Sequence, residues 1–113
     1  GVKLASGTNI GTLKSNNLGI STTATTVLNM ASAISSGDVG KGRYLITCCR
    51  DAGSVGTATS AIFGLSSTGA IYLYQVLNAN SLTFSTAGAE VKVAIDSGTC
   101  NVHTNAIPLT VDY

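Results

Sequence analysis

The side chains that could perform acid–base or metal chemistry are few. The 113 residues contain one histidine, His103, and five carboxylates. A serine hydrolase would need that histidine beside an activated nucleophile, but no Gly-x-Ser-x-Gly stretch is present. Cys100 lies three residues from His103 on an expected strand, so the two side chains would point to opposite faces and could not share a zinc ion. The sequence therefore predicts no catalytic residue, no metal site and no cofactor.

The five carboxylates do not single out a glycosidase pair. Glycoside hydrolysis needs two acids that flank one bond. Asp38 and Asp51 lie in expected turns, where aspartate is common for backbone reasons. Glu90 and Asp96 bracket an expected strand, and Asp112 lies near the end of the chain. Because the spacing selects no two of them, a glycoside hydrolase is only a lesser alternative.

Binding without catalysis fits the sequence better. Tyr72 and Tyr74 lie two apart, on one face of an expected strand, and tyrosine can both stack on a sugar ring and hydrogen-bond to it. Core packing is about twice as common for such a pair, given the burial habits of aromatic residues. Polar groups in the neighbouring turns suit hydroxyl-rich ligands. The candidate binding residues are Arg50, Asp51, Tyr72, Tyr74, Asn78, Asn80 and His103.

The stretch from Arg43 to Arg50 is predicted to be the central strand that organises the fold. Glycine-rich turns at 37–42 and 51–53 bracket it, and its residues are almost all apolar, β-branched or aromatic. Neither of its faces is clearly polar, so we expect both faces to be covered. The two faces would carry Tyr44, Ile46 and Cys48 on one side and Leu45, Thr47 and Cys49 on the other.

Turns and strands alternate over the rest of the chain, at about the 8–12-residue spacing of an all-β sandwich or barrel. The cleanest alternation runs from Glu90 to Asp96, with the valines and Ile95 facing inward. Ser97-Gly98-Thr99 predicts a tight hairpin, and Pro108 predicts an interruption before the last strand. The further expected strands are 57–63, 70–77, 81–85, 100–107 and 109–113.

The N-terminal part differs in composition from this β-rich remainder. Residues 1–26 are rich in Gly, Ser, Thr and Asn, with isolated apolar residues too sparse for a core of their own. We interpret them as an extended arm with short strands, ordered against neighbouring chains; a flexible linker is the alternative. Residues 27–34 are ambiguous and are interpreted as strand up to Met30. The predicted organisation is an arm at 1–26 and one domain at 27–113.

The chain is unusually poor in charge. Charged residues make up 10%, whereas about 25% is usual in soluble domains. Hydrophobic residues make up 44%, and the mean hydropathy is +0.36. Homo-oligomer interfaces have this character, so we expect the chain to cover part of its surface with copies of itself. The net charge of +1, without a basic cluster, argues against nucleic acid and anionic membranes, and no apolar run is long enough for membrane insertion.

The three cysteines form a poor disulfide framework, because their count is odd and two of them are adjacent. Cys48 and Cys49 would face opposite sides of a strand. We expect buried thiols that pack as small apolar side chains. A bridge from either of them to Cys100 remains an open alternative.

Several stretches between Gly40 and Tyr113 resemble known sequences in style. They read Gly-Lys-Gly-Arg-Tyr-Leu-Ile-Thr at 40–47, Ala-Ile-Phe-Gly-Leu-Ser-Ser-Thr-Gly at 61–69, Asn-Ala-Asn-Ser at 78–81 and Ser-Gly-Thr at 97–99. Together with a chain end on a strand, they resemble the C-terminal tip domains of tailed-phage tail fibres and tailspikes. Such domains are typically β-sandwich trimers that bind host surface glycans or outer-membrane receptors, and some act mainly as trimerisation caps. The arm at 1–26 is similar to the neck that joins such a tip to its shaft.

The resulting expectation is an antiparallel all-β sandwich or jelly-roll-like domain, homotrimeric, with an extended N-terminal arm. The resemblance implies a non-enzymatic part of a virion, assembled in the host cytoplasm and acting outside the cell, that binds a host receptor, most simply a glycan. It supplies no binding residues of its own. The alternatives are a structural trimerisation or virion decoration module without a ligand, and a glycoside hydrolase.

Overall fold

The computed structural model describes residues 13–31, 40–51, 57–78 and 81–112, and these are nearly all antiparallel β-structure. Residues 1–12 of the predicted arm and the candidate Asn80 lie outside the described residues. The strands are β1 (Leu13–Ile20), β2 (Thr25–Asn29), β3 (Lys41–Asp51), β4 (Thr57–Leu65), β5 (Ile71–Asn78), β6 (Leu82–Ala87), β7 (Glu90–Ile95) and β8 (Cys100–Asp112).

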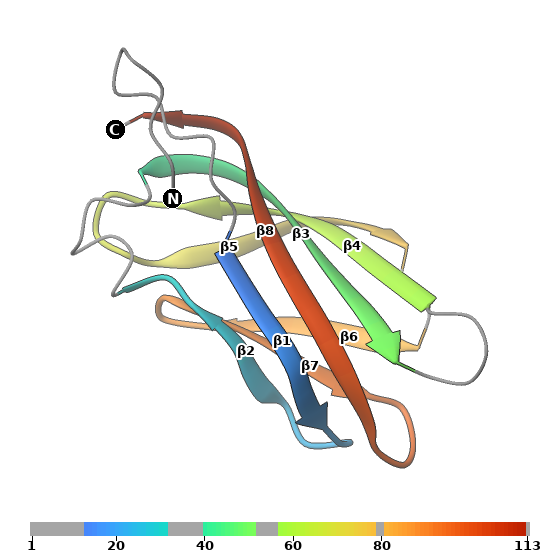
Figure 1. Cartoon of the computed structure of the whole chain (residues 1–113). Coiled ribbons are helices and arrows are strands. Elements are labelled where there is room, and N and C mark those ends of the chain that lie inside the picture. Colours follow the sequence, from blue (N-terminus) through green and yellow to red (C-terminus); the bar gives the residue numbers. More distant parts are fainter. Residues whose placement is uncertain (1–12, 32–39, 52–56, 79–80, 113) are drawn as a thin grey trace.

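The strands form two sheets. The larger has the order β1-β8-β3-β4-β5 and the smaller the order β2-β7-β6, with every neighbouring pair antiparallel. β1 pairs with β8 and β2 pairs with β7, so strands from the two ends of the described chain are neighbours in the sheets. Figure 1 shows the long strands β3 and β8 crossing the molecule side by side, with the smaller sheet below them.

The core lies between the two sheets and draws side chains from both. Phe63 of β4 and Phe84 of β6 meet across the layers, with ring centroids 5.4 Å apart and ring planes at 81°. This edge-to-face geometry is the one that aromatic quadrupoles favour. Ile46, Val93 and Val102 are also fully buried, as expected for the inward members of alternating strands.

The predicted central strand is correct in its position and in its alternation. β3 lies between β8 and β4, and Tyr44, Ile46 and Cys48 are buried. The prediction that both faces are covered is wrong for the second face, where Leu45, Thr47 and Cys49 are only half-buried. The smaller sheet packs against one side of the larger sheet, so the outward side of β3 is covered mainly by neighbouring side chains. β3 also begins at Lys41, inside the stretch interpreted as a glycine-rich turn.

The predicted inward face of β7 is confirmed. Val91, Val93 and Ile95 are buried, while Asp96 is exposed. The predicted hairpin at 97–99 is wrong, because β7 and β8 belong to different sheets and the turn carries the chain from one layer to the other. Gly98 has the positive φ of 74° that a tight turn needs. A tight turn does not, however, determine whether the strand that follows it pairs with the strand before it.

Pro108 does not end a strand as predicted. β8 continues through it to Asp112, and the pairing with β3 shifts between Tyr44↔Pro108 and Arg43↔Thr110, so that Leu109 forms a bulge. Within the described residues, the pairing of β8 with β1 reaches Ala106. Pro108 lies beside the Leu109 bulge, and bulges are among the places where a sheet tolerates proline.

Residues 13–30 belong to the two sheets. β1 lies in the larger sheet and β2 in the smaller, so the described part of the predicted arm, from residue 13 onward, is largely strand. Val27, Leu28 and Met30 are buried in the core. The strand predicted up to Met30 is confirmed within one residue, since β2 ends at Asn29.

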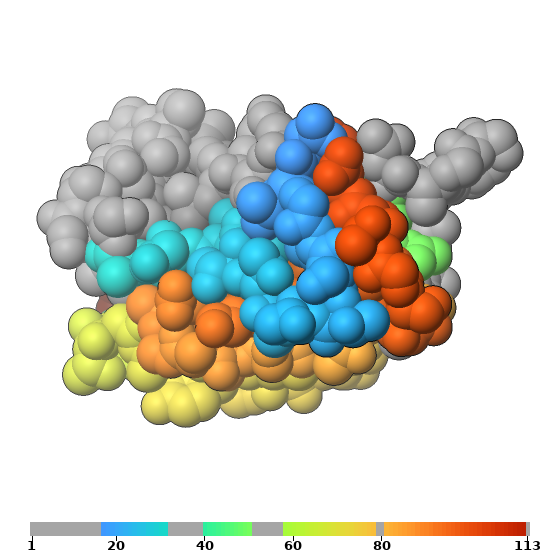
Figure 2. Space-filling model, turned by 90° about the horizontal axis from the view of Figure 1, so that it is seen from below, coloured from blue at the N-terminus to red at the C-terminus, as the bar shows by residue number. Residues whose placement is uncertain are grey.

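β5 differs from every other strand in its exposure. Only Ile71 is buried, and the seven residues that follow it are all exposed. β5 is an edge strand of the larger sheet, and the smaller sheet is too narrow to cover it. Figure 2 shows β2 in cyan beside β7 in orange, with yellow residues around β5 along the lower rim. The expectation that core packing was the more common fate of Tyr72 and Tyr74 is therefore wrong, since they are 54% and 55% exposed.

Candidate binding surface

A shallow groove of about 410 Å³ lies where one end of β3 meets β4 and β5. Its walls include both exposed tyrosines, Tyr72 and Tyr74, together with Arg43 and the turn at Ser66 and Ser67. β3, β4 and β5 are consecutive neighbours in the larger sheet, so a single row of cross-strand partners builds the groove floor. We call this feature the Tyr72–Tyr74 groove.

Gly64 is the middle member of that row. Arg43 on β3 pairs with Gly64 on β4, and Gly64 pairs with Tyr72 on β5. The β5 pairing jumps from Ile62↔Gln75 to Phe63↔Leu73, which leaves Tyr74 as an extra, bulged residue. Because Gly64 has no side chain, the Tyr74 ring can lie directly on it: a Cβ at Gly64 would be 2.0 Å from Tyr74 Cε2.

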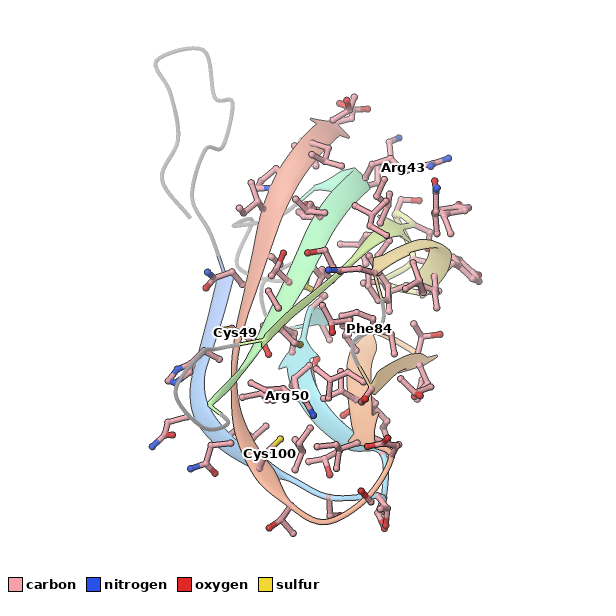
Figure 3. The ribbon with its side chains drawn as sticks, turned by 90° about the vertical axis from the view of Figure 1, so that its right-hand side faces the viewer. Arg43, Cys49, Arg50, Phe84 and Cys100 are labelled. Carbon is pink, nitrogen blue, oxygen red and sulfur yellow. The ribbon has the colours of Figure 1, made fainter. Side chains whose placement is uncertain are left out.

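The guanidinium of Arg43 lies over the Tyr74 ring. Its Cζ lies 3.9 Å from the centroid of the Tyr74 ring, within the range of a cation–π contact, which contributes about 0.5–1 kcal/mol at exposed sites. The Tyr74 ring thus lies between Gly64 and the Arg43 guanidinium. We call this arrangement the platform. Figure 3 shows Arg43 projecting from one end of β3, with Arg50 at the other end of the strand.

The turn between β4 and β5 gives the groove a well-ordered wall. The Ser66 N–H donates to the Ala70 carbonyl at 2.9 Å, and the Gly69 N–H donates to the Ser66 carbonyl at 3.0 Å. The Ser66 hydroxyl also accepts from the Ala70 N–H at 3.2 Å and contacts Thr68 Oγ1 at 2.8 Å. These local bonds are typical of Ser-containing turns, and they fix the backbone from which Tyr72 projects.

A second cation, Lys41, lies at the same end of β3. Its Nζ is 3.5 Å from the Asp112 carboxylate, and the two side chains are 53% and 78% exposed. An ion pair this exposed contributes little to stability. Its effect is local, because it offsets the Lys41 charge beside the Tyr72–Tyr74 groove.

Of the predicted binding residues whose side chains the structure describes, only Tyr72 and Tyr74 line this groove. Asn78 lies at the far end of β5, where its Oδ1 accepts from the Ser60 N–H at 2.8 Å and its Nδ2 donates to the Ala58 carbonyl at 3.1 Å. The oxygen and the nitrogen of the Asn78 amide therefore both hold β5 against β4, beyond the second register shift of β5. Asn78 supports the sheet and does not line the groove.

The other predicted residues are dispersed. Arg50 lies on the same side of β3 as Cys48, facing the smaller sheet, and its buried Nε has no hydrogen-bond partner within the described ranges. Asp51 ends β3, and its side chain lies outside the described residues. His103 is exposed on the outward face of β8, where its Nδ1 accepts from the Asn17 N–H at 3.2 Å. The interpretation of His103 as a surface strand histidine is thus confirmed.

The described carboxylates of β7 and the turn after it lie far apart. Glu90 accepts a hydrogen bond from Thr26 Oγ1 at 3.1 Å, and Asp96 lies just beyond the other end of β7. Six residues of strand separate their Cα atoms by about 20 Å, well beyond the roughly 5–10 Å between glycosidase carboxyl groups. Glu90 and Asp96 therefore do not form a hydrolytic pair. In the described part of the chain, no three His, Cys, Asp or Glu side chains gather as metal ligands would.

All three cysteines are free thiols, so neither of the possible bridges to Cys100 is formed. Cys48 is fully buried, and its Sγ lies 3.1 Å from Thr104 Oγ1 across the β3–β8 pair. Burial raises the pKa of the Cys48 thiol from its ordinary 9.0 to about 11, although the Thr104 hydrogen bond works in the opposite direction. Cys48 therefore acts as a core side chain.

The buried thiol predicts a loss of stability at alkaline pH. The unfolded thiol ionises near pH 9 and the folded one near pH 11, so the stabilisation is complete below pH 9 and falls away as the pH rises to 11. The two pKa units correspond to about 3 kcal/mol. Urea unfolding between pH 8 and 11 should show a flatter pH profile for Cys48→Ala than for the wild type. Parallel profiles would contradict this assignment.

No protein-family model, no curated protein and no solved structure matches this chain. Among the residues that the structure describes, no helix has the length and apolar character needed to cross a membrane. The Tyr72–Tyr74 groove and the exposed β5 edge are features of the described residues from which a function can be argued.

Sequence reasoning missed Arg43, Gly64 and Lys41 as contributors to the groove. Arg43 was interpreted only as the start of the central strand, and Gly64 only as part of the stretch that leads to the next turn. The sequence does place Arg43 on the outward face with Leu45. Its contact with Tyr74, however, depends on a bulge in β5 that shifts the register, and no local pattern signals that bulge.

Proposed function

We propose that this chain is a non-enzymatic binding module, the receptor-binding tip of a tailed-phage fibre or tailspike, which binds a host surface glycan in the Tyr72–Tyr74 groove. The observation that carries the proposal is the pair of half-exposed tyrosine rings beside Arg43, in a groove with a well-ordered turn as one wall. Large exposed apolar patches on a protein surface commonly mark interaction sites.

The groove has the chemistry that a sugar requires. A pyranose has an apolar C–H face and a rim of hydroxyls, so an aromatic ring with a polar tip matches both parts. Tyr72 offers a ring face, both tyrosines offer phenol hydroxyls, and Arg43, which covers one face of the Tyr74 ring, offers N–H donors. Because the Ser66 turn and the Gly64 contact hold these groups in place before a ligand arrives, binding would require little further ordering.

The larger assembly is part of the same proposal. The two facing sheets would be the jelly-roll-like sandwich of a fibre tip, with residues before β1 leading toward a shaft. Three copies would assemble in the host cytoplasm into a virion component that acts outside the cell. The sequence resemblance at 40–47, 61–69, 78–81 and 97–99 supports this reading, as do the low charge and the nesting of β1 with β8.

Glycan binding is expected to depend on the two tyrosines. The full chain should bind specific glycans on an array and should adhere to host cells. Tyr72→Ala and Tyr74→Ala should each weaken binding by at least about fivefold, since the first removes a stacking surface worth about 1 kcal/mol or more and the second removes the ring that holds Arg43. Leu109→Ala, which removes an exposed apolar side chain on β8, is the matched control. A blank array together with blank cells would refute the proposal.

A second candidate, a structural trimerisation or decoration module, is favoured by the β5 edge itself. Edge strands in soluble proteins are usually protected by charges or proline, and β5 has neither in Ile-Tyr-Leu-Tyr-Gln-Val-Leu-Asn. Its exposed apolar residues and free backbone edge suit pairing with another copy. A module of this kind would self-associate without any ligand.

Self-association is expected to depend on the part of β5 outside the groove. Light scattering should give a molar mass three times that of the 11.3 kDa chain. Val76→Lys and Leu77→Lys place a charge on exposed β5 positions and should lower that mass, whereas Ile107→Lys, on β8, is the control. A lone protomer at micromolar concentration would contradict the trimer. If Val76→Lys and Leu77→Lys kept the mass of a trimer, the interface would not involve β5.

A further inference from the structure

We infer that the Tyr72–Tyr74 groove selects saccharides that carry a carboxylate, and that Arg43 is the residue that binds it. This inference rests on the glycan binding proposed above and adds the class of ligand. Neutral and acidic glycans present the same ring faces to tyrosines, so the discrimination must come from the charged groups of the groove.

The pose of Arg43 suits a carboxylate. The guanidinium lies over the Tyr74 ring, with Cζ 3.9 Å from the ring centroid. The ring therefore covers one side of the guanidinium, and N–H donors remain for a ligand on the open side. A guanidinium presents two parallel donors that match the two oxygens of a carboxylate. Within the described residues, no carboxylate of the chain itself pairs with Arg43.

Stacking also pre-organises the side chain. A free arginine loses rotamer freedom when it binds an anion, at a cost of about 0.5–1.5 kcal/mol. The Tyr74 ring holds Arg43 from one side, and the Tyr74 ring itself lies on Gly64. Part of that ordering cost is therefore met before the ligand binds.

The charge balance of the groove is positive. The chain has six lysines and arginines in all, and two of them, Lys41 and Arg43, line this groove. Asp112 offsets Lys41 at 3.5 Å, which leaves the Arg43 charge uncompensated among the described groups. Such a local excess attracts anions and fades with added salt. It would not contribute to the binding of a neutral sugar.

The row Arg43–Gly64–Tyr72 sets the geometry of the site. Its three members lie on adjacent strands, so the row spans about 10 Å. A sugar ring against Tyr72 would thus hold a ring carboxylate toward Arg43 at the other end of the row. Figure 3 shows the Arg43 side chain extending away from the sheet, where such a group can reach it.

Two matched pairs of probes test the inference with the full chain. They are 3′-sialyllactose against lactose, and trigalacturonic acid against its methyl ester, each titrated by calorimetry at low salt. The acidic member of at least one pair should bind about tenfold more tightly, and the difference should shrink in high salt. Arg43→Gln should abolish the difference, while Arg43→Lys should retain only part of it, because lysine keeps the charge but not the planar fork.

Lys92→Gln is the matched control, because it removes the same charge from β7 in the smaller sheet. It should leave the preference intact. Equal binding of acid and neutral partner in both pairs would overturn the inference and leave glycan binding standing. A preference that survives in Arg43→Gln and Arg43→Lys would also overturn it. Failure of every probe, together with a blank glycan array, would overturn the proposed function as well.

Discussion

Gly42→Ala is expected to lower the free energy of unfolding by at least about 3 kcal/mol. A Cβ at this position would lie 2.1 Å from the Thr110 carbonyl oxygen and 2.7 Å from Val111 Cα. Both atoms belong to the backbone of β8 just after its bulge, so neither can move without disturbing the β3–β8 pairing. Gly42 also has a φ of 146°, a conformation that residues with a Cβ rarely adopt.

Gly98→Ala separates these two causes. Gly98 also has a positive φ, 74°, but no heavy atom lies within 4 Å of the position its Cβ would take. This variant should therefore show only the conformational cost, about 1 kcal/mol. Urea unfolding of both variants measures the difference. If Gly42→Ala were as stable as Gly98→Ala, the close approach of β3 and β8 at Gly42 would be incorrect.

Gly64→Ala is expected to remove glycan binding while leaving the fold almost unchanged. The atoms that its Cβ would meet are Cε2, Cζ and the hydroxyl oxygen of Tyr74, at 2.0, 2.9 and 3.0 Å. They form the far end of an exposed side chain, which can swing outward at little cost in stability. That movement separates the Tyr74 ring from Arg43 and dismantles the platform. We expect a loss of at least about tenfold in affinity, with less than about 1 kcal/mol in stability.

Two measurements decide the outcome for Gly64→Ala. In wild-type protein, NMR should show the Arg43 side-chain protons shifted upfield by the Tyr74 ring, and the variant should lose that shift. Gly19→Ala is the matched control, because Gly19 is an outward strand glycine whose Cβ would meet only Asn101 Oδ1, at an ordinary 3.5 Å. Retained affinity in Gly64→Ala would show that the stacked platform is not part of the binding surface.

The sequence predicted the interior strands well. The valines of β7 were expected to face inward, because strand side chains alternate and only that alternation of β7 is apolar. For β3 the alternation was predicted, but the sequence did not distinguish the buried face from the half-buried one. It failed for β5, whose composition is as apolar as that of a buried strand. Apolar composition indicates that a surface is unfavourable in water, but it does not say whether the same chain covers it.

The candidate site was predictable only in part. Tyr72 and Tyr74 were found because their types and spacing carry a chemical meaning on their own. Arg43 and Gly64 acquire their roles from strands that are neighbours in the sheet and from a bulge at Tyr74. Asn78 and His103 looked equally suitable in the sequence, but backbone hydrogen bonds engage both of them.

The pairing of β1 with β8 also constrains how the protein is made. Ile20 pairs with Cys100, eighty positions later in the chain, so the first strand has no partner when it leaves the ribosome. At about 5–20 residues per second, that interval lasts roughly 4–16 s. During this time β3 and β4 can already form their local hairpin, whereas the larger sheet must wait for the last strand before it closes. Until β8 emerges, β1 therefore remains an unpaired strand, and unpaired strand edges are prone to aggregation.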